Sequence, residues 1–160
     1  MSKVLIDKWK SQKDNERLLN KLDTKISRQK VDHAFAEKIH VKVFEETDCL
    51  QCANCCKSIP PVVSKRDSKR IANHLGLTKQ AFAEKYLVTD NDGDTVISSS
   101  PCPFLMDDNK CKIYPHRPTA CRQYPHSGDF MFYKNLNHHK RNAKYCPALF
   151  EILKRLAKIK

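Results

Sequence analysis

Four cysteines stand within one short stretch of the sequence, Cys49-Leu-Gln-Cys52-Ala-Asn-Cys55-Cys56. Thiolates are ligands that zinc and iron–sulfur clusters prefer, and a C-x-x-C loop curls around a single metal. Another four cysteines follow, so the chain of 160 residues contains eight. The pattern therefore predicts a metal-binding protein, and the candidate ligands are Cys49, Cys52, Cys55, Cys56, Cys102, Cys111, Cys121 and Cys146.

The spacing of the cysteines does not select the metal. Cys49, Cys52 and Cys55 match the first three positions of a ferredoxin-like C-x-x-C-x-x-C loop, which favours iron as an iron–sulfur cluster. Tetrahedral zinc accommodates the same thiolates. In extended backbone the side chains of Cys55 and Cys56 would diverge toward two metals, although some turns let both reach one centre. The sequence leaves open both iron versus zinc and one site versus two.

Other kinds of site chemistry fit these residues less well. A cysteine nucleophile needs a partner histidine, and none of the seven histidines stands in a spacing that nominates it. Radical-SAM proteins use C-x-x-x-C-x-x-C, which this run lacks, and the three glycines form no phosphate-binding pattern. The sequence therefore identifies no catalytic residue, and it leaves open whether the protein is an enzyme.

Polar residues around Cys121 are candidates for supporting a thiolate centre. Arg117 and Arg122 flank this cysteine, and such donors stabilise the negative charge of a thiolate site and tune its potential. Tyr114 and Tyr124 could donate hydrogen bonds from the same loop. The alternative for the arginines is a surface ion pair with a nearby carboxylate, from Asp107, Asp108 or Asp129.

Two histidines lie five residues on either side of Cys121, at His116 and His126. Imidazole completes many zinc and iron sites, so both are candidate additional ligands. The alternative is an ordinary hydrogen bond from a loop, because the thiols alone can satisfy the ligand count.

The N-terminal sequence and the hydropathy of the chain predict the cellular compartment. Residues 1–10 carry charges every few positions, so we expect no secretory signal peptide. No apolar segment approaches the length that spans a bilayer, so we expect no membrane partner. Without an export signal we expect a cytoplasmic protein. Because disulfides are rare in the cytoplasm, we also expect its thiols to be reduced.

The formal net charge is +12, and the basic excess is concentrated toward the C-terminus. Residues 102–160 carry twelve basic and four acidic side chains, whereas residues 1–48 are nearly balanced. A second hypothesis is therefore a zinc-stabilised binding module with a basic surface for nucleic acid or an acidic protein. The residues that would form this surface are Lys134, Lys140, Arg141 and Lys144. A solvated helical face is the alternative interpretation of these charges.

Apolar periodicity predicts helices on both sides of the cysteine-rich segment. Residues 1–46 have the pattern of one interrupted helix or two shorter helices, and we expect them to pack on a metal-binding domain at residues 47–160. From Pro147 to Ile159 the pattern is that of an amphipathic helix with proline in its first turn. We therefore expect an α+β fold, a small cysteine-rich domain with short hairpins, flanked by N- and C-terminal helices.

Short signals between the cysteines predict the local elements. Ser64 and Asp67 have capping-box spacing and open a helix that Gly76 ends. Asp92-Gly93 is a strong hairpin signal between two β-prone pieces. We expect a second hairpin at residues 107–109.

The ordered set of motifs resembles the CxxCxxCC cysteine-cluster family, the YkgJ-like proteins. The resemblance covers about residues 49–149. Its motifs are Cys49–Cys56, Cys102-Pro103-Phe104-Leu105, Cys111-Lys-Ile-Tyr114, Arg117-Pro118 with Cys121-Arg122, and Cys146-Pro147. The resemblance implies a domain that binds zinc or an iron–sulfur cluster. Flagellin lysine N-methylases carry a similar motif in much longer chains, although this chain has no recognisable SAM site.

Overall fold

The computed structural model describes residues 3–29, 32–128 and 132–158. The chain divides into two compact units, which are described separately. The helical unit comprises Met1–Cys52 and Pro125–Lys160, and the hairpin unit comprises Ala53–Tyr124. The boundary falls inside the cysteine run. The helical unit therefore contains Cys49, Cys52 and Cys146, and the hairpin unit contains Cys55, Cys56, Cys102, Cys111 and Cys121.

The described part of the helical unit is built from α-helices and one short 3-10 helix. They are α1 (Lys3–Gln12), α2 (Glu16–Gln29), α3 (His33–Glu45), η1 (Cys49–Gln51), α8 (Leu136–Ala143) and α9 (Pro147–Leu156). The N-terminal region thus forms three α-helices where the sequence predicted one or two. The extra break follows Gln12, and the Asn15 side chain accepts the Leu18 N–H at 3.0 Å to begin the next helix. No helix within the described ranges is both long and apolar enough to cross a bilayer.

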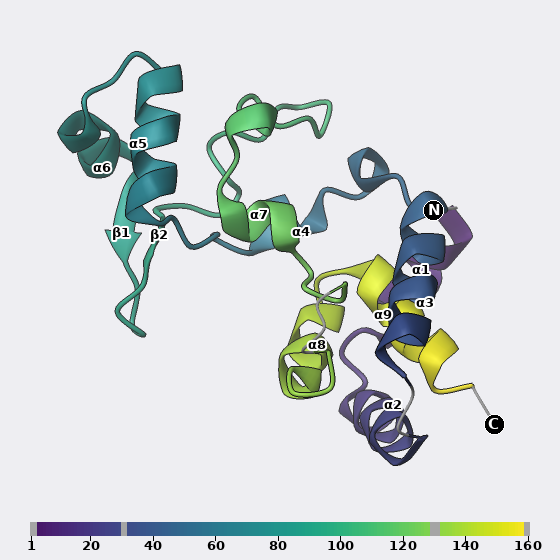
Figure 1. Ribbon diagram of the computed structural model, residues 1–160. Helices are drawn as coiled ribbons and strands as arrows, with labels where there is room; N and C mark the ends of the chain where they lie inside the picture. The colour runs from purple at the N-terminus through teal and green to yellow at the C-terminus, as the bar shows by residue number, and fades with distance from the viewer. Residues whose placement is uncertain (1–2, 30–31, 129–131, 159–160) are drawn as a thin grey trace. The chain divides into compact units, whose positions relative to one another are not determined.

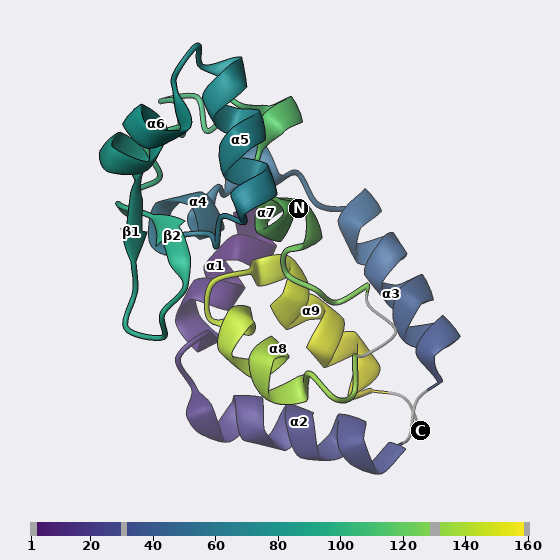
Figure 2. The same cartoon turned by 60° about the vertical axis from the view of Figure 1, so that its left-hand side comes forward.

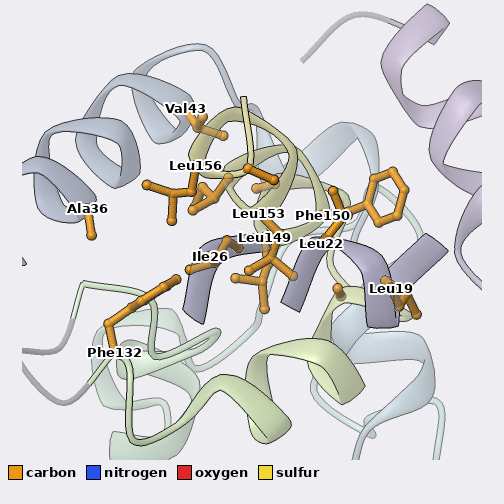
Figure 3. Packing of buried hydrophobic residues seen from close by; sticks show 14 of the residues in the cluster. Leu19, Leu22, Ile26, Ala36, Val43, Phe132, Leu149, Phe150, Leu153 and Leu156 are labelled. Carbon is orange, nitrogen blue, oxygen red and sulfur yellow. The ribbon is translucent and has the colours of Figure 1, made fainter. Parts of the chain in front are cut away.

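Helix α9 is the centre of the helical unit. It packs against α1, α2, α3 and α8, as Figure 2 shows. Its residues Leu149, Ile152 and Leu156 are completely buried. They belong to one cluster with Leu19 and Ile26 of α2, and Figure 3 shows Leu149 and Leu156 in it. Each such side chain contributes about 1.5–3 kcal/mol through removal from water. The predicted helix from Pro147 and its apolar face are confirmed up to Leu156, and Ile159 lies outside the described residues.

The hairpin unit combines short helices with one two-stranded sheet. Its elements are α4 (Asn54–Ser58), α5 (Lys65–His74), α6 (Lys79–Tyr86), β1 (Leu87–Thr89), β2 (Thr95–Ile97), η2 (Tyr114–His116) and α7 (Thr119–Gln123). Strands β1 and β2 are antiparallel (Figure 1), and Leu87 of β1 pairs with Ile97 of β2. The predicted α+β class is confirmed.

The predicted caps and turns of the hairpin unit are present. The Ser64 hydroxyl accepts the Asp67 N–H at 3.0 Å at the start of α5. Gly76 follows this helix with φ +68°, a conformation that glycine adopts without strain. In the β1–β2 turn, Gly93 has φ +84° and the Asp90 carboxylate accepts two backbone N–H groups of the turn. Local sequence therefore fixes these boundaries.

The core of the hairpin unit lies directly beside two cysteine-bearing segments. Phe104 and Ile113 are buried in one cluster with Phe82 of α6, and Cys102 and Cys111 pack against that cluster. Each of the two apolar residues comes two positions after one of the cysteines. Burial of Phe104 and Ile113 therefore anchors the backbone next to each thiol.

Candidate metal centre

Four of the five cysteines of the hairpin unit lie near one another: Cys56, Cys102, Cys111 and Cys121. They are called here the hairpin-unit thiols, a name that does not include Cys55. The Cys56 carbonyl accepts the Cys102 N–H at 2.8 Å, which joins the cysteine run to the downstream segment. Burial raises the pKa of Cys121 to about 12, and the thiolates of the other three add to the rise. Burial likewise raises the pKa of Cys102 and Cys111, and the Cys56 thiolate contributes to both shifts. Like charges act in this way when they are close together.

A tight turn positions two of these thiols. Leu105 and Cys111 form an antiparallel bridge, and the Met106 N–H donates to the Lys110 carbonyl at 2.9 Å. Asn109 takes φ +64° within this turn, a left-handed conformation that asparagine tolerates better than most residues. The second predicted hairpin is therefore present as a single bridge, and it brings Cys111 back alongside the segment that follows Cys102.

Cys55 and Cys56 lie in the short helix α4, not in extended backbone. Their sulfur atoms are 4.0 Å apart. A hydrogen bond from the Cys55 thiol lowers the pKa of Cys56 to about 7 against the opposing effect of burial, and the charges of Lys57 and Arg117 assist. Cys56 is therefore the hairpin-unit thiol that ionises most readily at neutral pH.

Arg117 and Arg122 donate to the backbone of the loop that carries Cys121. Arg117 Nη1 donates to the Tyr114 carbonyl at 2.9 Å, and its guanidinium lies 3.8 Å from the centre of the Tyr114 ring. Arg122 Nη2 donates to the Pro115 carbonyl at 2.6 Å. The Arg117 charge acts to lower the pKa of Cys56, Cys111 and Cys121. The positive charge of this loop therefore favours ionised thiols.

Two of the three carboxylates considered as alternative partners of the arginines can be assigned. Asp108 pairs with Lys110 at 2.8 Å. Asp129 lies outside the described residues.

The two tyrosines proposed as hydrogen-bond donors differ in exposure. Tyr124 follows α7 directly and is half-buried, whereas Tyr114 is 58% exposed.

The two histidines considered as ligands belong to different units. The ring of His116 stacks on His74 with centroids 4.0 Å apart, and burial together with the positive charges of its neighbours lowers the pKa of His116. Its Nδ1 atom is buried and has no hydrogen-bond partner among the described residues. His126 belongs to the helical unit and has φ +64°. The structure thus places His116 against a second imidazole.

The cysteines of the helical unit, Cys49, Cys52 and Cys146, form a second group, called here the helical-unit thiols. The Cys52 N–H donates to the Cys49 carbonyl at 3.1 Å, so the C-x-x-C segment is a closed turn. The sulfur of Cys146 accepts the Leu149 N–H at 3.4 Å at the start of α9. Burial raises the pKa of Cys146 to about 12, and the Cys49 and Cys52 thiolates contribute. The structure thus brings these three thiols near one another.

Both groups have donor chemistry that suits a thiophilic metal. All eight cysteines are described, and the structure holds each as a thiol outside any disulfide. In the described ranges, no three Cys, His, Asp or Glu side chains are already arranged around one point as an ion requires. Neighbouring thiolates contribute to the raised pKa of Cys102, Cys111, Cys121 and Cys146, and a bound cation removes this repulsion. The thiols therefore fit zinc or iron by donor type.

Sequence reasoning missed a hydrogen-bond network around the buried Asp67 carboxylate, which reaches Thr119 in the helix of Cys121. The sequence predicts Asp67 only as part of a helix cap, yet its carboxylate also accepts two hydrogen bonds from Thr119. Arg70 completes the network through Asp67 and the Arg117 carbonyl. The one sequence signal was Pro118 before Thr119, which is typical of a helix start whose N–H groups need an acceptor.

Comparison with known proteins places the cysteines in one family. The family model "CxxCxxCC: Putative zinc- or iron-chelating domain" matches residues 48–147. "Uncharacterized protein MJ0661" of Methanocaldococcus jannaschii is 34% identical over 82 residues, which cover 49% of this chain and 44% of that protein. No solved structure matches the chain at a significant level. The family model spans more than half of the sequence and all of its cysteines, and the chain therefore belongs to the CxxCxxCC family of zinc- or iron-chelating domains.

Proposed function

We propose that the hairpin unit binds iron, as an iron–sulfur cluster, through Cys56, Cys102, Cys111 and Cys121, in a redox or metal-handling role. The observation that carries the proposal is geometric: the Cys56 carbonyl accepts the Cys102 N–H at 2.8 Å, and the Leu105–Cys111 bridge brings Cys111 back to the same segment. The influence of all three thiolates on the pKa of Cys121 supports the inclusion of this cysteine. Family membership supports chelation of zinc or iron. Four cysteine thiolates are a complete ligand set for an iron–sulfur cluster and equally for tetrahedral zinc, so the test below must separate the two metals.

The titration behaviour of these thiols is suited to metal capture. A thiol must lose its proton to become a ligand. Cys56, with a pKa of about 7, supplies the first thiolate near neutral pH. Burial and like charge oppose ionisation of Cys121, and the positive charge of a metal would reverse that balance. Once bound, an iron–sulfur cluster would supply one-electron redox chemistry, whereas zinc would act as a structural cross-link.

The proposal also includes the helical-unit thiols as ligands. Cys49 and Cys52 come from one turn, and Cys146 begins α9, so a metal held by all three would link two distant segments. His126 belongs to the same unit and is a candidate fourth ligand. Cys55 is a further candidate ligand beside Cys56 in the hairpin unit.

Two of the four basic residues in the alternative, nucleic-acid-binding hypothesis have partners within the helical unit. Lys140 donates to the Asn20 side chain at 2.9 Å, and Lys144 forms an ion pair with Glu16. Both lysines are thus engaged within the helical unit, which favours an intramolecular role over a nucleic-acid surface.

The direct test is a measurement of the metal content of protein purified without oxygen, with an absorption spectrum of the same sample. Iron with acid-labile sulfide and broad visible bands would support the cluster. Stoichiometric zinc without colour, from cells grown with ample iron, would replace iron by zinc in the proposal. Protein with neither metal would overturn it.

Two variants give the measurement of metal content a matched comparison. Cys121→Ser should lower the metal content, because it removes one proposed ligand. Ser58→Ala, which changes an exposed residue at the end of α4, should leave the metal content unchanged. Equal metal content in both variants would remove Cys121 from the ligand set.

A further inference from the structure

Asp67 is a buried carboxylate whose two oxygens are both fully engaged. Its side chain is 2% exposed. Oδ1 accepts from Arg70 Nη2 at 2.7 Å and from the Thr119 hydroxyl at 3.0 Å. Oδ2 accepts from the Ser64 hydroxyl at 2.8 Å and from the Thr119 N–H at 3.2 Å. A buried charge is stable only when it is paired and hydrogen-bonded in this way.

The bonds to Thr119 tie α5 to the helix that carries Cys121. Thr119 is 52 residues away from Asp67 and is the first residue of α7. Pro118, which precedes α7, offers no side-chain cap, so the Asp67 carboxylate supplies the acceptor that the helix start needs. A five-residue helix is not stable by itself, and this contact therefore matters to its position.

Arg70 holds the preceding loop from the same side. Its Nη2 donates to the Arg117 carbonyl at 2.8 Å and to the His116 carbonyl at 3.4 Å. Arg122 Nε also donates to the Arg117 carbonyl, at 3.3 Å. The segment that leads into α7 is thus fixed by guanidinium groups from two different elements.

We infer that the Asp67–Arg70 pair is a positioning device for the metal centre. It would hold the loop at 116–119 so that Cys121 meets the other hairpin-unit thiols. The inference rests on the proposed function. Four hydrogen bonds join the pair to residues 116–119: Arg70 donates two of them and Asp67 accepts the other two. Arg70 is 31% exposed, and an ion pair with a partly exposed partner adds little net stability, so stability alone does not account for this arrangement.

The test uses Co²⁺ as the probe, because thiolate-to-cobalt absorption reports how many thiolates bind the ion. Outer partners of metal ligands typically contribute about 10–100-fold to affinity. Asp67→Asn should weaken Co²⁺ binding by about this factor and reduce the charge-transfer absorption toward that of Cys121→Ser. The double variant should bind little more weakly than Cys121→Ser alone, because both changes remove the same ligand.

A milder matched pair separates positioning from folding. Thr119→Val removes the hydroxyl that bonds Asp67 from α7, whereas Thr78→Val removes the hydroxyl that accepts the Ala81 N–H at the start of α6. We expect Thr119→Val to reduce the charge-transfer absorption, and Thr78→Val to lower thermal stability while leaving the spectrum unchanged.

The outcomes distinguish this inference from the proposed function. Wild-type protein that binds no Co²⁺, zinc or iron would overturn both. Wild-type protein that binds metal, with Asp67→Asn and Thr119→Val matching its affinity and spectrum, would overturn only the positioning role.

Discussion

The sulfur of Cys146 accepts a hydrogen bond from the backbone N–H of Leu149 at 3.4 Å, so this cysteine caps α9. The capped helix is the one on which the other helices of the unit pack. A proposed metal ligand is therefore also the residue that begins the central helix. Metal binding at the helical-unit thiols would consequently be coupled to the stability of that unit.

Serine and alanine at position 146 should separate capping from metal binding. Serine keeps an acceptor for the Leu149 N–H, and alanine does not. In metal-free protein, Cys146→Ala should be about 1 kcal/mol less stable than Cys146→Ser. With metal present, both variants should show a smaller fall in melting temperature on chelation than the wild type does, because both lack the thiolate. Thermal unfolding with and without a chelator measures both effects, and a wild-type-sized chelation shift in Cys146→Ser would exclude this ligand.

Metal-free protein should lose stability as the pH rises above about 9. Burial raises the pKa of Cys121 and of Cys146 to about 12 in the folded protein, from an ordinary value of 9.0. Above the ordinary value the unfolded chain has lost protons that the folded protein keeps, so the free energy of unfolding falls with pH. Each group contributes at most about 1.4 kcal/mol per pH unit.

The thiol of Cys56 has the opposite effect on the free energy of unfolding, at lower pH. The hydrogen bond from Cys55 lowers the pKa of Cys56 from 9.0 to about 7 in the folded protein. The stabilisation by this ionised thiol is therefore fully present above pH 9.0 and is lost as the pH falls through 7. Urea unfolding of metal-free protein across both windows checks the two signs. Cys121→Ser should flatten the alkaline loss, and an unchanged slope in that variant would contradict the assignment.

Short-range signals in the sequence predicted the local elements of the hairpin unit. The Ser64–Asp67 cap, the stop at Gly76 and the turn at Asp92-Gly93 depend on residues only a few positions apart, so their spacing is visible in the sequence. Helix α8 was not predicted, because its exposed face is polar and basic. Its buried residues His139 and Ala143 are too few to show an apolar period.

The grouping of the cysteines depends on contacts that spacing does not reveal. The sequence treats Cys49–Cys56 as one nucleus, yet the unit boundary divides this run, and Cys146 from the far end lies near Cys49 and Cys52. The position of α7 likewise depends on the long-range bond between Asp67 and Thr119. Candidate ligand types were therefore readable from the sequence, whereas their partners required the tertiary structure.

Trp9 offers a test of how the N-terminal helix is attached. Its indole N–H donates to the Ala143 carbonyl at 2.8 Å, and the side chain is 3% exposed. Trp9→Phe should reduce the free energy of unfolding by about 1–3 kcal/mol, because the carbonyl at the end of α8 loses its buried donor. Phe35→Leu, at a residue of α3 that is 40% exposed, should change it by less than about 0.5 kcal/mol. Equal effects in denaturant unfolding would mean that the indole bond adds nothing to stability.

The ion pair between Lys144 and Glu16 distinguishes the two interpretations of the basic segment. The hydrogen bond to Glu16 raises the pKa of Lys144 and lowers that of Glu16. Lys144→Glu would place like charges together, so we expect a lower melting temperature at low salt and a smaller loss at high salt, where exposed charges are screened. The double variant Lys144→Glu with Glu16→Lys should restore the melting temperature. Lys134→Glu, at an exposed position, should leave the melting temperature unchanged. If Lys144→Glu instead unfolds like the wild type and abolishes a steeply salt-dependent affinity for nucleic acid, the basic segment is a binding surface.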